Sequence, residues 1–155
     1  MSVDSIQFLD DDRVREFLES ARVAHLATAD RAGTPHNIPI CFWFDGGRRF
    51  YFVIDEKPKR RTSGGIKRMR NIAENPQVAL VVDHFDEDWS RLAYVLIHGE
   101  AHTLADSGHY ATVLRNLRDK YPQYRTMTLE PDRNTMVVIE ASRVHRWGAR
   151  FNSAN

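Results

Sequence analysis

The chain has 155 residues, of which 42% are hydrophobic and 28% charged, and its formal net charge is +1. This length and composition are those of a single globular domain spanning residues 1–155 that buries most of its apolar surface. The small net charge argues against a surface built to bind nucleic acid, and no uninterrupted apolar run of ~20 residues is present that could cross a membrane.

Cysteine usage and the start of the chain bear on location. Cys41 is the single cysteine, so no internal disulfide can form, and the first residues do not read as a charged-then-apolar leader. We therefore expect a cytoplasmic protein. Because Cys41 lies among the aromatic residues of "ICFWF", we expect it to be an inert core thiol.

The first third of the chain predicts one helix and three strands. Residues 10–20 begin with capping acids and place Val14, Phe17 and Leu18 on one helical face. Strands are expected at 22–29, 36–44 and 48–54. The turn "DRAGTP" joins the first two strands as a hairpin.

The remainder predicts two helices and four strands. A short helix is expected at 66–74 and ends at "NP", because proline disfavours helical geometry in the residue before it. The apolar spacing of 106–121 indicates the longest helix of the chain. Further strands are expected at 77–85, 92–104, 135–142 and 143–151.

Six to seven strands in hairpin order, with only two to three helices between them, do not alternate as a doubly wound parallel fold would. The pattern predicts a mainly β protein, an antiparallel barrel with helices packed on its outside. Because side chains fill the interior of so small a barrel, a ligand would sit on a rim, in a groove or at a subunit boundary.

Positive charge is concentrated between residues 57 and 70. Seven of the 22 basic residues lie there without an acid among them: Lys57, Lys59, Arg60, Arg61, Lys67, Arg68 and Arg70. Such groups at the start of a helix favour phosphate, although the spacing is not that of a nucleotide P-loop. The alternatives are a solvated loop and a contact for nucleic acid, and the small net charge counts against the second.

The order of three stretches resembles a known family. "TPHNIPICFWFDGGRRFYFVIDEKPKR", "IKRMRNIAENPQVALVVDHFDEDW" and "YVLIHGEA" together resemble the split-barrel flavin and deazaflavin oxidoreductases related to pyridoxamine 5′-phosphate oxidase, over residues 20–148. Within them the chain is most similar to the subgroup of F420-dependent enzymes. The resemblance implies an enzyme, a homodimer of split β-barrels with the cofactor at the subunit interface and a small-molecule substrate.

The resemblance also implies residues for the cofactor phosphate. Lys59 matches the phosphate-binding lysine of the family, and Lys57 matches a neighbouring polar contact. Lys57 replaces a serine, and Pro58 an arginine, that are common in flavin-binding members. Arg60 and Arg61 are expected to compensate.

Further residues are implied for the ring. Asn37, Ile38, Pro39 and Ile40 match the strand whose backbone lies along the isoalloxazine-like ring. Tyr94 falls where flavin-binding members often carry a ring-contacting glutamine. Trp147 with Arg150 resembles the pair that approaches the cofactor from the partner subunit.

The charge favours F420 over FMN as the cofactor. One FMN phosphate needs two or three donors, whereas the oligoglutamate tail of F420 carries several carboxylates that a basic loop with Lys67 could follow. The implied chemistry is hydride transfer between the deazaflavin and a small organic substrate. The alternatives are an FMN-dependent oxidase or reductase and a non-catalytic protein that binds a flavin, deazaflavin or haem-like molecule.

No catalytic residue is assigned. Tyr94, His98 and His36 are candidates for proton delivery, but each could equally be a packed strand residue. No metal site is expected, because His98 and His102 on one strand would stand ~13 Å apart.

Overall fold

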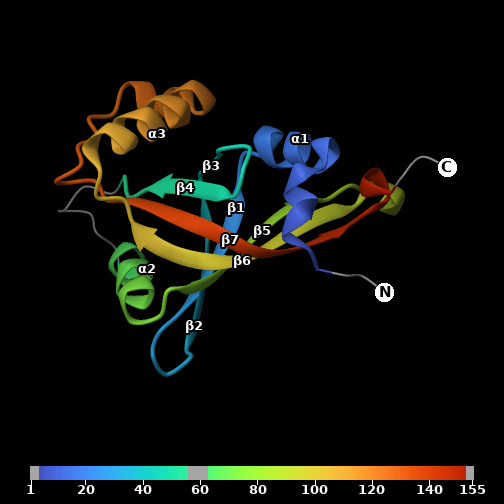
Figure 1. Cartoon of the computed structure of the whole chain (residues 1–155), viewed down its shortest axis with the longest axis horizontal. Coiled ribbons are helices and arrows are strands. Elements are labelled where there is room, and N and C mark those ends of the chain that lie inside the picture. Colours follow the sequence, from blue (N-terminus) through green and yellow to red (C-terminus); the bar gives the residue numbers. More distant parts are fainter. Residues whose placement is uncertain (1–3, 56–62, 153–155) are drawn as a thin grey trace.

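The computed structural model describes residues 4–55 and 63–152, and within them seven antiparallel strands form one curled half-barrel sheet (Figure 1). The sheet order is β2-β1-β5-β6-β7-β4-β3. The strands are β1 (Ala24–Ala29), β2 (Pro35–Ile40), β3 (Trp43–Phe44), β4 (Arg49–Val53), β5 (Gln77–His84), β6 (Ala93–Thr103) and β7 (Met136–Trp147). The prediction of a mainly β split barrel is confirmed.

In the part of the chain that the structure describes, three α-helices accompany the sheet: α1 (Asp12–Ser20), α2 (Ser63–Glu74) and α3 (Ser107–Lys120). Short 3-10 helices are η1 (Ile6–Asp10), η3 (Trp89–Arg91), η4 (Pro122–Arg125) and η5 (Ala149–Phe151). The carboxylate of Asp11 caps α1, and that of Asp106 caps α3, by accepting hydrogen bonds from backbone amides of the first turn. None of the described helices is both long and apolar enough to span a membrane.

Strand alternation produces the core inside the curl. Leu26, Leu80, Val95 and Ile97 are fully buried on this inner face, where the apolar side of α1 packs against them. A second core lies on the opposite face of β4 and β7, where Tyr51 and Met136 and their strand neighbours pack under α3. Strand β4 is therefore buried on both faces.

The outer face of β1, β5 and β6 is more open. Residues that alternate with the core positions are half-buried there, among them Ala27, Ala79, Val81 and Leu96. We call this surface, together with the same side of the neighbouring strands β2 and β7, the outer face. Its centre is apolar. On the same face the His25 ring of β1 lies 3.6 Å from the Asp83 carboxylate of β5.

The structure corrects four expectations. The predicted strand 36–44 is interrupted at positions 41 and 42, where Phe42 turns inward and its amide donates to the Tyr121 hydroxyl at 3.1 Å. Cys41 consequently points outward and is exposed, so the expectation of a core thiol was wrong. Helix α2 begins three residues before the predicted helix, at Ser63.

The fourth correction concerns the end of the chain. The two strands predicted at 135–142 and 143–151 are one continuous strand, β7, followed by η5. A register shift between His98 and Gly99 of β6 lets the long β6–β7 pair bend without a turn.

Candidate functional site

Among the described residues, strand β2 forms one end of the sheet and pairs only with β1. Pro35 and Pro39 lack an N–H, so they fit positions whose backbone polar groups point away from the partner strand. In an antiparallel pair alternate residues share that orientation, so the N–H and C=O of Asn37 face the free edge as well. The edge therefore offers one donor and several carbonyl acceptors to a flat ligand.

A hollow of about 210 Å³ lies beside the C-terminal end of this strand. Its apolar part is formed by Pro39, Ile40, Phe52 and Val53, where β2 and β4 end. Its polar part is formed by Cys41, Asp55, Arg68 and Tyr124. Asp55 is the last described residue before segment 56–62, so the hollow lies where the basic stretch begins in the chain.

Burial controls the polar groups of this hollow. It raises the pKa of Tyr124, and the Asp55 carboxylate beside the hydroxyl adds to the effect, so this phenol stays a neutral hydrogen-bond donor. Although Cys41 is exposed as a residue, partial desolvation of its sulfur in the hollow raises the pKa of the thiol. A neutral thiol is a poor nucleophile, so neither group supplies an anion at neutral pH.

The predicted phosphate-binding residues are only partly described. Lys57, Lys59, Arg60 and Arg61 lie outside the described residues. Lys67 is described, on α2, and its ammonium lies 3.4 Å from the Asp30 carboxylate.

The predicted ring-binding residues fall into two groups. Asn37 and Pro39 are exposed on the outer side of β2, whereas Ile38 and Ile40 point into the core. Tyr94 stacks on Trp147 with ring centroids 5.8 Å apart and an interplanar angle of 21°.

The predicted Trp147 and Arg150 pair is divided. Trp147 is 49% exposed at the end of β7, whereas the Arg150 guanidinium lies 4.8 Å from the ring centre of Phe17, over the core. Gly148, between them in the chain, has φ +129°, and a Cβ on it would lie 2.6 Å from the Leu92 carbonyl oxygen. The Trp147 corner therefore requires glycine at position 148.

Within one chain the predicted ring-binding residues of β2 do not meet the Tyr94–Trp147 stack. Pro39 is aligned across the strands with His25, Val81, Leu96 and His145. Trp147 lies two residues beyond His145 on β7. Four strand spacings separate β7 from β2, which is ~19 Å across the strands of the sheet. Both groups nevertheless belong to the outer face, which makes them available to a second molecule that covers this face.

The three candidate proton donors are also separated. Tyr94 and His98 lie on the outer face, whereas His36 points inward and its Nδ1 atom is buried without a hydrogen-bond partner among the described residues. A ligand on the outer face could reach the first two but not His36.

Residues that the sequence did not single out for this site are Asp55, Arg68, Cys41 and Tyr124. Arg68 belongs to the basic stretch, where residue type alone could have selected it. Tyr124 comes from η4, far along the chain, and carries no motif that would place it here.

Comparison with known proteins identifies the family. The family model described as pyridoxamine 5′-phosphate oxidase matches residues 10–148. The chain belongs to this family.

A curated relative and two solved structures are informative. The 5a,11a-dehydrotetracycline/5a,11a-dehydrooxytetracycline reductase of Streptomyces rimosus subsp. rimosus is 33% identical over 133 residues, which are 85% of this chain and 78% of the relative. The haem storage protein HutZ of Vibrio cholerae superposes with a TM-score of 0.67 at 14% identity, covering 90% of this chain and 97% of that one. An FAD-binding protein of Mesorhizobium loti has a TM-score of 0.63 at 19% identity, covering 85% and 89%. The two structures share the fold with this chain.

The residues present fit a flavin or deazaflavin. The free edge of β2 offers a donor and several acceptors to a heterocyclic ring, and the exposed ring of Pro39 provides apolar surface beside it. Arg68 in the same hollow supplies a cation for a phosphate.

Proposed function

We propose that the protein is an F420-dependent oxidoreductase that reduces a small organic substrate. The free edge of β2, ending in a hollow lined by Arg68 of the basic stretch, is the observation that carries this proposal. The relative of 33% identity is named as a reductase, which supports the reaction class. The excess of basic residues over what one phosphate needs supports the cofactor.

The proposal includes a homodimer formed through the outer face. The apolar centre of that face and the exposed Tyr94–Trp147 stack suit contact with a second copy. A two-fold axis through the face would bring the stack of one chain toward Asn37 and Pro39 of its partner. The ring would then be enclosed between two subunits, although a single chain leaves it open on one side.

The chain's own groups have defined roles in this mechanism. When bound, the deazaflavin supplies hydride transfer. The edge of β2 orients the ring, Arg68 and the basic stretch hold its anionic part, and the stacked rings of Tyr94 and Trp147 exclude water from the reacting face. Tyr94 and His98, on the outer face, are placed to hold a proton near the substrate.

A parallel titration tests the cofactor. Purified protein is titrated with F420 and with FMN at low and moderate salt, following tryptophan fluorescence. We expect tight F420 binding that weakens with salt, weaker FMN binding, and loss of F420 affinity when Lys57, Lys59 and Arg60 are all replaced by alanine. The triple substitution Arg115→Ala, Arg125→Ala, Arg133→Ala removes the same charge elsewhere and should leave binding unchanged.

Turnover then separates the remaining alternatives. Reduced F420 is mixed with protein and 5a,11a-dehydrooxytetracycline, the compound named for the relative, and cofactor oxidation is followed by absorbance. Preference for FMN would overturn the cofactor assignment. Binding of F420 without oxidation across a panel of acceptors would instead favour a non-catalytic binding protein.

A further inference from the structure

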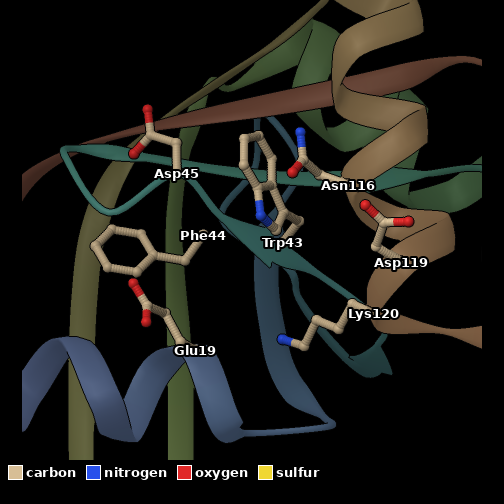
Figure 2. A pocket seen from close by; sticks show the side chains of 7 residues that line it. All are labelled: Glu19, Trp43, Phe44, Asp45, Asn116, Asp119 and Lys120. Atoms are coloured by element: carbon tan, nitrogen blue, oxygen red, sulfur yellow. The ribbon is translucent and has the colours of Figure 1, made fainter.

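A second hollow, of about 400 Å³, lies between α1, β3 and the end of α3 (Figure 2). It lies at the β3 end of the strand order, whereas the proposed cofactor edge is β2 at the other end, and it shares no lining residue with the hollow beside β2. The proposed cofactor site does not use it. Its lining residues are Glu19, Trp43, Phe44, Asp45, Asn116, Asp119 and Lys120.

Lys120 is the unusual member of this lining. Figure 2 shows its side chain extending from α3 toward α1, beneath Trp43. Its amine nitrogen is buried and donates no hydrogen bond to any described residue. The nitrogen lies 3.9 Å from the ring centre of Phe42 and 5.3 Å from that of Tyr121. A lysine amine without an acceptor in such surroundings is costly to keep charged.

A second cation lies nearby. The guanidinium of Arg22 lies 4.6 Å from the Tyr121 ring centre, on the ring that Lys120 also approaches, and donates to the Lys120 carbonyl oxygen at 2.7 Å. Burial first, and then the charge of Arg22, lower the pKa of the Lys120 amine to about 8. The negative charges of an ionised Cys41 and of Glu19 act in the opposite direction and are outweighed. A desolvated amine beside another cation is the arrangement that makes a lysine nucleophilic.

We propose that Lys120 is a carbonyl-reactive lysine, whose amine captures an aldehyde or ketone in this hollow as an imine. The flexible stem turns the amine from Phe42 toward Trp43, and the neutral nitrogen attacks the carbonyl carbon. The carbinolamine then loses its oxygen as water, so that a C=N bond replaces the C=O bond without any oxidation or reduction. The carboxylates of Glu19 and Asp119 line the hollow and are placed to carry the protons.

The lining also selects the class of carbonyl compound. The half-buried indole of Trp43 offers flat apolar surface. Three carboxylates surround it, those of Glu19, Asp45 and Asp119, and they repel an anion. The hollow therefore favours neutral or cationic carbonyl compounds with a planar or apolar body over carboxylated or phosphorylated ones.

Reductive trapping tests the proposal, because the chain has only four lysines, Lys57, Lys59, Lys67 and Lys120. Folded protein is treated with benzaldehyde and cyanoborohydride at pH 7, and the rate of labelling at each lysine is measured by peptide mass spectrometry. At this pH an amine of pKa about 8 is neutral about 300 times more often than one near 10.5. We expect Lys120 to be labelled at least about tenfold faster than Lys67, which is held by Asp30.

Further arms make the result specific. The Lys120 rate should rise with pH and level off above about 8, and 4-carboxybenzaldehyde should react more slowly there than benzaldehyde. Combining Glu19→Gln with Asp119→Asn should reduce that preference. Lys120→Arg, which keeps the charge, should fold normally and lose the rapid label.

Two results would overturn the proposal. One is a Lys120 that stays unlabelled in the folded protein while Lys67 reacts, and becomes labelled only in urea. The other is labelling of Lys120 at the rate and pH dependence of an ordinary surface lysine.

Discussion

The Tyr94 ring lies stacked on Trp147 across the β6–β7 pair, and the two residues face each other directly in the strand register. We expect Trp147→Ala to change the free energy of unfolding of the monomer by less than about 1 kcal/mol, because the side chain is half exposed. It should weaken both self-association and F420 binding by tenfold or more, measured by sedimentation and by titration. Trp89→Ala, at a side chain that is 74% exposed, should change neither. Unchanged association in the Trp147 variant would argue against the outer face as the dimer interface.

Gly148 allows the chain to turn directly after this stack. We expect Gly148→Ala to destabilise the fold by about 1–3 kcal/mol, since its Cβ would meet Leu92 and Ala93 and the backbone would adopt a strained φ. Thermal unfolding measures the loss. Gly108→Ala, in the first turn of α3, is the matched control. Its new Cβ would lie 3.4 Å from Asp106 Oδ1, an ordinary van der Waals distance, so the substitution should be neutral or stabilising.

Asn71 anchors α2 to the sheet. Its side-chain amide is fully buried and donates to the Thr28 hydroxyl at 3.0 Å. Asn71→Ala should cost about 1–3 kcal/mol in urea unfolding, because the buried hydroxyl of Thr28 would lose this partner. Since α2 carries Arg68, we also expect weaker F420 binding in this variant. Arg70→Ala, exposed on the same helix, should leave the free energy of unfolding nearly unchanged. A stable Asn71→Ala protein would show that other contacts hold the helix.

Asp11 should make stability depend on acid pH. Hydrogen bonds from Arg13, together with that from Arg146, hold the pKa of this carboxyl well below its usual range near 3.8. The stabilisation is therefore complete above pH ~4 and is lost as the pH falls from there toward the folded-state pKa. Asp11→Asn retains a capping side chain, so we expect a deficit in unfolding free energy at pH 7 that shrinks below pH 4. A deficit independent of pH would show that the charge is not its cause.

Strand alternation and helical spacing predicted most of the fold. The burial patterns of β1, β5 and β6 follow the alternation of the sequence, and α1 begins directly after one of the acids expected to cap it. Periodicity could not show the break at positions 41 and 42, because "ICFWF" is apolar throughout and the break depends on a hydrogen bond from Phe42 to the distant Tyr121.

The candidate site was less predictable than the fold, because contacts between residues distant in the chain also form it. The edge strand and the basic stretch could be selected from residue types, but Tyr124 and Asp55 are brought together only by the packing of η4 beside β4. Lys120 is a residue whose environment the sequence could not predict. At the end of a helix a lysine reads as a cation that complements the helix dipole. Its buried amine depends on Phe42 and Tyr121 meeting in space, which no local pattern records.

The two prolines of β2 have a consequence for the behaviour of the protein at high concentration. An unpaired strand normally invites edge-to-edge addition of another strand and hence aggregation. At Pro35 and Pro39 the free edge has no N–H to donate, so an incoming strand would lose a hydrogen bond every fourth residue. The same edge that remains open to a small heterocycle is thus poorly suited to extending the sheet.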